Sequence, residues 1–254
     1  MAELNHQEML RYNRQIAIHG FDFDKQEQLK QAKAIIVGLG GLGCAAAPYL
    51  AAAGFGQLLL IDFDNIALSN LQRQILFREQ DIGRYKVEVA AEQLRAINPY
   101  CKLQTAPQQV QESLFENVID HYHVVIDCTD NLNVRNYLNR ICYQHRRPLI
   151  SGAAIRMEGL LTSFQYQDNQ PCYQCLSHLF GQQTLTCSET GVMSPLVGII
   201  GSMQAMEAIK IVTGFGTPLN GRILLLDALT MQTQELVLAK NSNCEICSQN
   251  TLSS

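Results

Sequence analysis

The stretch Ala34-Ile-Ile-Val-Gly-Leu-Gly-Gly-Leu-Gly-Cys44 predicts the fold of this chain. Its apolar half leads into Gly38, Gly40 and Gly43, which have the spacing G-x-G-x-x-G, and a run of small residues, 45–53, follows. This order indicates a buried strand, a tight turn and a helix whose N-terminal N–H groups face the turn. Such helix N-termini bind phosphate, although glycine turns also arise for packing alone. The stretch therefore favours a nucleotide-binding site.

A carboxylate at the end of the next predicted strand supports this interpretation. The apolar residues 58–61 are followed directly by Asp62. In open α/β sheets, ligands bind at the carboxyl ends of the strands, and a carboxylate in this position holds ribose hydroxyls. We therefore expect Asp62 to bind the ribose of a nucleotide.

Composition limits the classes of protein to which the chain can belong. It has 254 residues, of which 47% are hydrophobic and 17% charged, enough for one large α/β core. The net charge of −4 argues against a nucleic-acid-binding protein. Residues 1–8 predict no signal peptide, and the apolar residues 192–211 contain polar side chains, which indicates a buried helix and no membrane span. Nine cysteines without a secretory signal indicate a reducing compartment, which we expect to be the cytoplasm.

Strands and helices alternate along the first 150 residues of the chain. The expected strands are 35–37, 58–61, 102–105, 124–126 and 148–150, and the expected helices are 45–53, 86–97, 112–119 and 134–145. This α/β alternation is typical of a doubly wound, mostly parallel sheet of the Rossmann type. The later segments 159–167, 222–226 and 233–238 predict antiparallel strands that extend the sheet. We expect a single domain, residues 1–254, made of a helical arm (1–30), a nucleotide-binding core (31–150) and an antiparallel extension (151–254).

Two C-x-x-C pairs stand far apart in the sequence: Cys172 with Cys175, and Cys244 with Cys247. Each pair can place two sulfurs on one tetrahedral ion, and two pairs complete a four-thiolate zinc site. Such a site would be structural, because protein fills all four positions. The alternative is two unrelated or redox-active pairs.

Polar residues gather after the predicted strand ends: Asp62, Asn70, Arg73, Lys86 and Asp130. A site that handles a triphosphate needs fixed cations such as Arg73 and Lys86, whereas hydride transfer has little need of them. Asp130 could bind Mg²⁺, which prefers one or two carboxylates plus phosphate oxygens. Each residue alone would be ordinary on a surface, but their shared location favours a site.

Two further residues are ambiguous from spacing alone. Cys187 has no C-x-x-C partner and lies in a polar segment, so it could be a reactive thiol or a small buried side chain. Arg14 lies in the helical arm, where periodicity indicates a surface helix with solvated arginines.

Several motifs resemble the ubiquitin-activating-enzyme-like superfamily, and within it the MoeB branch of the HesA/MoeB/ThiF family. The motifs shared with the superfamily are Arg11-Tyr-Asn-Arg-Gln15, Gly38-Leu-Gly-Gly-Leu-Gly43, Asp62-Phe-Asp64, Ser69-Asn-Leu-Gln-Arg-Gln74, Lys86, Asp127-Cys-Thr-Asp-Asn131 and the paired C-x-x-C segments. Residues 151–159 and 172–176 resemble the MoeB branch in particular. The resemblance covers essentially the whole chain.

The resemblance implies a reaction. The C-terminal glycine carboxylate of a small ubiquitin-like sulfur carrier (MoaD-like) would attack the α-phosphate of ATP and release pyrophosphate. A separate sulfur donor would then act on the adenylate, in molybdopterin and molybdenum cofactor biosynthesis. A carboxylate is already ionised at neutral pH, so this chemistry requires fixed cations and no general base.

The resemblance also implies roles for single residues. Gly41 would contact the nucleotide through its backbone and Asp62 would bind the ribose. Lys86 would neutralise the triphosphate, and Asp130 with Asn131 would lie near Mg²⁺ and the α-phosphate. The segment that wraps the phosphates would be Ser69, Asn70, Leu71, Gln72 and Arg73, with Arg73 as the main cation.

Two implied roles concern the dimer and the lone thiol. Arg14 resembles an arginine that relatives insert into the neighbouring subunit's site, which implies a homodimer. Cys187 matches the position at which ubiquitin-type relatives form a thioester, and its role here stays open.

Three alternatives remain at this point. The first is a ThiF-like enzyme that adenylates a ThiS-like carrier in thiamine biosynthesis, because the ATP-binding residues do not separate the two carriers. The second is an NAD(P)-dependent oxidoreductase, which the glycine turn alone would permit. The third is a non-catalytic scaffold that binds a ubiquitin-like tail.

Overall fold

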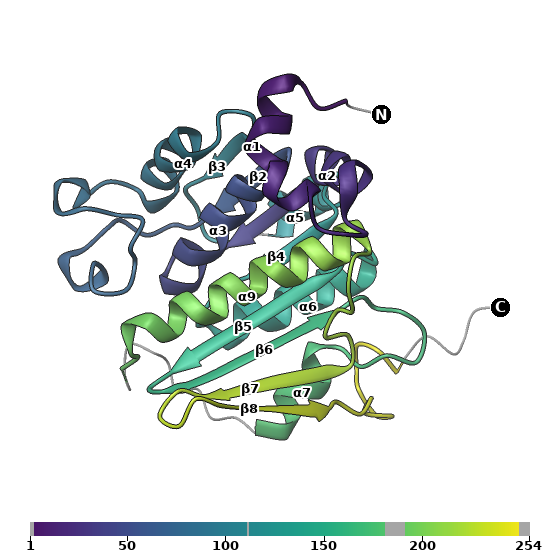
Figure 1. Ribbon diagram of the computed structural model, residues 1–254. Coiled ribbons are helices and arrows are strands. Elements are labelled where there is room, and N and C mark those ends of the chain that lie inside the picture. The colour runs from purple at the N-terminus through teal and green to yellow at the C-terminus, as the bar shows by residue number, and fades with distance from the viewer. Residues whose placement is uncertain (1–2, 111, 181–190, 249–254) are drawn as a thin grey trace.

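One mixed sheet forms the centre of the molecule (Figure 1). The computed structural model describes residues 3–110, 112–180 and 191–248, and within them eight strands join in the order β3-β2-β1-β4-β5-β6-β7-β8. Strands β1 to β5 are parallel, and β6, β7 and β8 continue the sheet in antiparallel fashion. The strands are β1 Lys33–Val37, β2 Gln57–Ile61, β3 Lys102–Ala106, β4 Val124–Asp127, β5 Leu149–Ile155, β6 Glu158–Phe164, β7 Arg222–Asp227 and β8 Gln232–Val237.

The expected doubly wound sheet with an antiparallel extension is therefore confirmed, with changes at the ends of two strands. Strand β5 continues five residues beyond the expected 148–150, and β6 stops at Phe164, short of the expected 167. Both changes follow from pairing, because every residue of β5 has a partner on β6, from Leu149 opposite Phe164 to Ile155 opposite Glu158.

Helices cover both faces of the sheet (Figure 1). Helices α2, α3, α4 and α9 pack on one face, and α5, α6 and α7 pack on the other. Strand β1 serves both layers, because Ala34 and Ile36 point to the first and Ile35 and Val37 to the second. The helices are α1 His6–Ile16, α2 Asp22–Gln31, α3 Gly41–Ala53, α4 Lys86–Ile97, α5 Glu112–Val118, α6 Leu132–Gln144, α7 Tyr173–Phe180 and α9 Ser194–Thr213, with short 3₁₀ turns η1 Leu68–Asn70, η2 Glu79–Asp81 and η3 Ile119–His121.

The glycine-rich turn joins β1 to α3 by very close backbone contacts. Gly38 has a φ of +90°, and a Cβ there would lie 2.9 Å from Cys128 O on the neighbouring strand's end. A Cβ at Gly43 would lie 2.1 Å from Gly38 O. Helix α3 begins at Gly41, four residues before the expected 45, because these glycines allow the chain to turn tightly and start the helix at once. Gly41 therefore lies in the first turn, where N–H groups have no partner within the helix.

Helix α9 lies against α3 and the sheet (Figure 1). By length and composition this helix could cross a membrane, but half of its most apolar 18-residue stretch is buried inside the molecule. A Cβ at Gly201 would lie 2.3 Å from Leu42 O, so the two helices approach backbone to backbone. Residues 192–211 were expected to form a buried helix, and the structure confirms it.

Candidate functional site

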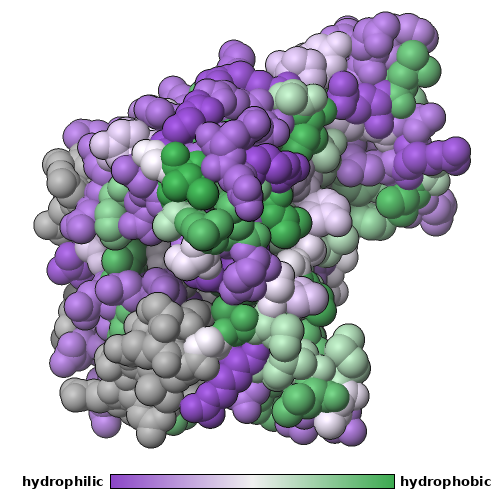
Figure 2. Space-filling view, turned by 90° about the vertical axis from the view of Figure 1, so that its left-hand side faces the viewer, coloured by the Kyte–Doolittle hydropathy of each residue, from purple (hydrophilic) through white to green (hydrophobic). Residues whose placement is uncertain are grey.

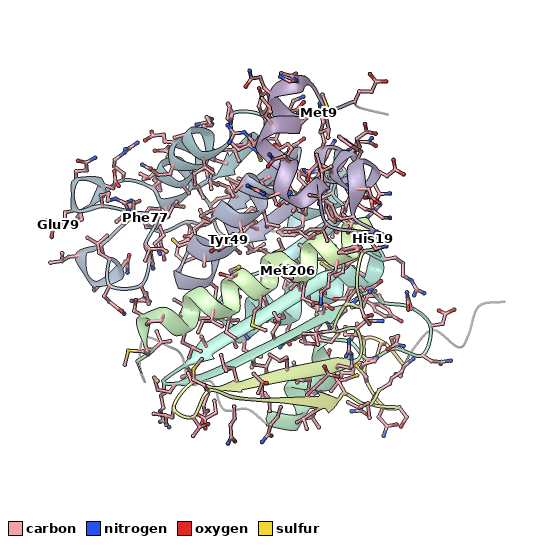
Figure 3. All side chains as sticks on the ribbon, viewed as in Figure 1. Met9, His19, Tyr49, Phe77, Glu79 and Met206 are labelled. Atoms are coloured by element: carbon pink, nitrogen blue, oxygen red, sulfur yellow. The ribbon has the colours of Figure 1, made fainter. Side chains whose placement is uncertain are left out.

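A long loop, residues 62–85, leaves the carboxyl end of β2 and leads to the start of α4. In Figure 3 the labels Phe77 and Glu79 mark this loop, which extends away from the sheet at the left. Its two ends pair with each other, because Ile66 N donates to Arg84 O over 2.9 Å and Lys86 N donates to Asp64 O over 3.0 Å. This pairing fixes Lys86 beside the end of β2.

Asp62 holds the glycine-rich turn in place. Its Oδ2 accepts a hydrogen bond from Leu39 N at 2.6 Å, and its Oδ1 accepts one from Asp64 N at 2.8 Å. Burial raises the pKa of Asp62, whereas nearby Lys86 and the two N–H donors act in the opposite direction. Each oxygen can accept one further hydrogen bond, which leaves room for a ribose hydroxyl. The expected contact with a ribose stays a prediction.

Lys86 is buried and its ammonium is paired. The Nζ lies 2.7 Å from Asp64 Oδ2, and the Lys86 side chain is 5% exposed whereas that of Asp64 is 47% exposed. The carboxylate thus stands on the solvent side of the ammonium. Sequence reasoning found the cation but did not find this partner.

Arg73 lies on a tight backbone turn of the same loop. Asn70 O accepts hydrogen bonds from Arg73 N and Gln74 N, and the Asn70 side chain accepts one from Ala67 N at 3.0 Å. Arg73 Nη1 donates to Ser69 O over 3.1 Å. No carboxylate of the described chain lies within ion-pair distance of the Arg73 guanidinium, so its charge is available to a ligand.

The rest of the predicted phosphate-wrapping segment is accessible. Ser69 and Gln72 are exposed, and Leu71 is half-buried against the core. Ser194 Oγ at the start of α9 donates to Gln72 O. The segment is therefore attached to α9 as well as to its own loop.

Asp130 and Asn131 follow the end of β4 and are both exposed. Asn131 is the N-cap of α6, and its Oδ1 accepts from Val134 N over 3.1 Å. In a doubly wound sheet the carboxyl ends of neighbouring parallel strands lie at one edge. The pairing of Val37 with Ile61 on one side and with Asp127 on the other therefore places the segments that bear Arg73, Lys86 and Asp130 at the same end of the sheet, on either side of β1.

Sequence reasoning missed a buried charged pair beneath Asp130. Asp127 has no exposed surface, and Arg135 Nε on α6 lies 3.9 Å from its Oδ2. Burial alone would lower the pKa of Arg135, but Asp127 and Tyr173 raise it above its ordinary value. The signal in the sequence was an aspartate at the end of an apolar strand with an arginine in the next predicted helix, and only long-range contacts distinguish such a pair from surface charges.

Arg14 is not brought to this group of residues. Arg14 is exposed on α1, where Tyr12 accepts a hydrogen bond from Asn98 Nδ2 at 2.8 Å, at the C-terminal end of α4. Lys86 is at the opposite end of this 12-residue helix, about 18 Å away along its axis. Cys187 lies outside the described residues.

The four cysteines of the C-x-x-C pairs form one buried cluster. Cys172 Sγ and Cys244 Sγ are 3.6 Å apart, Cys175 Sγ and Cys247 Sγ are 3.4 Å apart, and all four sulfurs lie within 4.8 Å of one another. The cluster joins the start of α7 to the segment after β8. The expected convergence of the two pairs is thus observed.

The surroundings of the sulfurs fit a bound cation. Asn139 Nδ2 on α6 donates to Cys172 Sγ over 3.5 Å, and Asn241 N donates to Cys175 Sγ over 3.4 Å. The side-chain hydrogen bond between Cys172 and Cys175 lowers the pKa of the Cys175 thiol and raises that of Cys172, as expected for two thiols that share a proton. Several buried thiolates this close together repel each other unless a metal compensates them, and four sulfurs are the set that suits zinc.

The glycine turn, the cationic loop and the cysteine cluster together define an α/β protein of the nucleotide-binding class with four sulfurs arranged to hold a metal ion. Residues 12–246 match the ThiF family, and the chain belongs to it. It is 54% identical to the molybdopterin-synthase adenylyltransferase of Salmonella typhimurium and 55% identical to that of Escherichia coli, in each case over 98% of this chain and 100% of the relative. It is 51% identical to the enzyme of the same name from Haemophilus influenzae, over 95% and 99% of the two chains.

Solved structures share the fold. The crystal structure of PaaA matches 95% of this chain and 76% of its own with a TM-score of 0.80 and 26% identity. Escherichia coli MccB with ATP matches 88% of this chain and 68% of its own, with a TM-score of 0.77 and 23% identity. The resemblance to the ThiF family that the sequence motifs indicated is confirmed.

Proposed function

We propose that this protein adenylates the C-terminal glycine carboxylate of a MoaD-like sulfur carrier with ATP, in molybdenum cofactor biosynthesis. The proposal depends on one observation above all, the identity of 54% and 55%, over 98% of the chain, with two enzymes named molybdopterin-synthase adenylyltransferase. A carboxylate oxygen of the carrier attacks the α-phosphorus, the bond from that phosphorus to the bridging oxygen breaks, and pyrophosphate leaves. The product is a mixed anhydride of the carboxylate and AMP.

The side chains at the strand ends suit this reaction. Attacking and attacked groups are both anionic, so the first requirement is fixed positive charge, which Arg73 and Lys86 supply. Gly41 in the first turn of α3 would offer a backbone N–H to a phosphate, and Asp62 would bind the ribose. The segment Ser69 to Arg73 lies along the triphosphate.

Asp130 and Asn131 complete the site. Their exposed oxygens at the end of β4 would hold Mg²⁺, with Asp130 as the charged ligand. The bound cation would reduce the charge of the phosphates. A carboxylate needs no deprotonation at neutral pH, which agrees with a site that has no histidine among its proposed members.

We further propose a homodimer in which Arg14 enters the partner's site. Two observations support this. First, Arg14 is exposed on α1, and α1 contacts the end of α4 that is opposite to Lys86. The long loop exposes large apolar side chains, with Leu68 67% and Ile75 65% exposed, and Figure 2 shows hydrophobic residues gathered on the side of the molecule where this loop lies. Such a surface favours cover by another protein.

The remaining parts of the proposal are structural. The cysteine cluster would bind one Zn²⁺ that does not take part in the reaction, because all four of its positions are sulfurs of the protein. Residues 1–254 would act as one domain in the cytoplasm, where thiols stay reduced, and the described cysteines form no disulfide. A separate sulfur donor would act after adenylation.

Mass spectrometry tests the proposed reaction. The protein is incubated with MgATP and a purified MoaD-like carrier, and in parallel with a ThiS-like carrier. We expect the MoaD-like carrier alone to gain the mass of AMP, with release of pyrophosphate. Adenylation of the ThiS-like carrier in its place would assign the protein to thiamine biosynthesis, and adenylation of neither would reject the proposal.

A further inference from the structure

Arg135 is a nearly buried arginine that joins two separate parts of the backbone. Its Nε donates to Thr129 O over 3.2 Å, and its Nη2 donates to the same oxygen and, over 3.0 Å, to Gly152 O. Only 13% of the side chain is exposed. Thr129 comes directly before Asp130, and Gly152 lies on β5. One planar guanidinium therefore connects the loop after β4 to the neighbouring strand.

Asp127 holds Thr129 from the other side. Its Oδ1 accepts from Thr129 N at 3.0 Å and from Thr129 Oγ1 at 2.7 Å, while its Oδ2 accepts from Ser151 Oγ at 3.1 Å. Thr129 is thus fixed at its amide, its hydroxyl and, through Arg135, its carbonyl. A residue held at three groups has little freedom, so the direction in which the chain continues to Asp130 is set.

The two charges depend on each other. Asp127 has no exposed surface, and of the cations in the described ion pairs Arg135 is the one that faces it. Loss of Arg135 would leave a buried carboxylate without a counter-charge and would leave the Thr129 and Gly152 carbonyls without this donor. A lysine would keep the charge, but an ammonium does not reproduce the planar fork that reaches both oxygens.

We propose that Arg135 is a positioning residue for adenylation, which fixes the Thr129 carbonyl and thereby sets where Asp130 and Asn131 stand relative to Mg²⁺ and the α-phosphate. This inference rests on the proposed function and adds a residue that makes no contact with substrate. Arg73 lies in the loop 62–85 and Lys86 begins α4, and among the described residues the hydrogen bonds and the ion pair of Arg135 go to neither. Loss of Arg135 should therefore affect turnover and the use of Mg²⁺ far more than the binding of ATP.

The test compares Arg135→Gln and Arg135→Lys with a matched control, Arg140→Gln. Arg140 is an exposed arginine of the same helix whose guanidinium lies 5.7 Å from the centre of the Tyr137 ring. For each full-length variant, carrier-dependent exchange of labelled pyrophosphate into ATP is measured over ranges of ATP and Mg²⁺. Calorimetry measures ATP affinity with EDTA and with Mg²⁺, and thermal unfolding reports the folded fraction.

We expect Arg135→Gln to lower kcat by about 10- to 100-fold, because a small displacement of a catalytic group has effects of that size. The Arg135→Gln substitution should also raise the Mg²⁺ concentration that gives half-maximal rate several-fold. Mg²⁺ should increase the ATP affinity of the wild type but not that of the variant. ATP affinity in EDTA should not change. Arg135→Lys should recover part of kcat, and Arg140→Gln should match the wild type.

Two results would overturn the inference. One is an Arg135→Gln protein with the kcat and Mg²⁺ dependence of the wild type. The other is activity of both Arg135 variants that falls only in proportion to their folded fraction, with Mg²⁺ dependence unchanged, which would make the role purely structural. A wild-type protein that shows no carrier-dependent exchange would instead reject the proposed function, and the calorimetric comparison would still test the inference.

Discussion

Lys86 Nζ lies 2.7 Å from Asp64 Oδ2, so the buried cation at the end of β2 already has an anionic partner. Asp64 is the more exposed of the two and stands between Lys86 and solvent. An incoming phosphate must therefore share the ammonium with this carboxylate or displace it. The pair keeps a buried charge compensated when no nucleotide is bound.

Replacing Asp64 by Asn should strengthen the binding of metal-free ATP. The substitution removes a charge that repels phosphate and competes for Lys86, and partly exposed pairs of this kind correspond to about a two- to fivefold change in affinity. Isothermal titration calorimetry in EDTA measures it, with Asp64→Glu as the control that keeps the charge. Weaker binding by Asp64→Asn would mean that Asp64 mainly holds Lys86 in position.

Arg73→Ala should lower adenylate formation by about 10²- to 10³-fold, the effect usual for loss of a fixed group that stabilises developing charge. The fold should persist, because among the described residues the Arg73 side chain makes a single hydrogen bond, to Ser69 O. Arg78→Ala on the same loop is the control, since Arg78 Nη1 donates to nearby carbonyls, those of Ile75 and Phe77. Pyrophosphate exchange measures the rates, and normal turnover by Arg73→Ala would refute its assigned role.

Subunits that carry Arg14→Ala and Lys86→Ala should complement each other in a mixed dimer. Each homodimer lacks a group from both of its sites, whereas the heterodimer contains one site with both Arg14 and Lys86. Co-expression with two affinity tags yields the heterodimer, and pyrophosphate exchange measures the rescue. Heterodimers as inactive as both parents would show that Arg14 does not act across the interface.

Cys172→Ser and Cys244→Ser should each remove bound zinc and lower the midpoint of thermal unfolding. A serine oxygen is a poor ligand for zinc, and the remaining sulfurs would be left crowded and buried. Elemental analysis of the purified protein gives the metal content. Cys101→Ser, at a buried cysteine outside the cluster, should keep its zinc. Retention of metal by both cluster variants would contradict the four-sulfur site.

Gly43→Ala should destabilise the protein by about 1–3 kcal/mol, as overpacking does. The added Cβ would lie 2.1 Å from Gly38 O, a backbone atom that cannot move aside without opening the turn. Gly198→Ala in α9 is the matched control, because outside the helix's own backbone no atom of the described part of the chain lies within 4 Å of its Cβ position. The control should be neutral or more stable by about 0.5–1 kcal/mol, since alanine favours a helix. Urea unfolding followed by circular dichroism measures both.

Local patterns were sufficient to predict most of the fold. The apolar run of β1 indicates a buried strand, and the glycine spacing after it indicates a tight turn into a helix. The strand, the turn and the doubly wound sheet could therefore be predicted directly from these patterns. The exact start of α3 did not follow, because it depends on how closely Gly43 approaches Gly38, which is a contact and not a propensity. The extension of β5 beyond 150 likewise depends on its partner β6.

The candidate site was predicted in its ligand-facing members but not in its supporting ones. Cations such as Arg73 and paired cysteines are conspicuous in a sequence because their chemistry is distinctive. The Asp127–Arg135 pair and the Lys86–Asp64 pair depend on loop and helix conformations that bring residues 8 and 22 positions apart into contact, and periodicity does not contain that information. A single sequence therefore indicated what the site can bind better than what holds it in shape.

Helix α6 has one end at the proposed nucleotide site and, two turns further along, touches the sulfur cluster. Asn131 caps its start, and Asn139 donates to Cys172 and accepts from Tyr173 N at 2.9 Å. Because a helix is stiff, a shift of Asn139 at the sulfur cluster should also shift Asn131 at the proposed nucleotide site. Chelation of the metal or oxidation of the cysteines should thus change nucleotide binding at the other end of α6. Cofactor synthesis in the cell would then depend on zinc supply and redox stress, although the proposed zinc does not take part in the reaction.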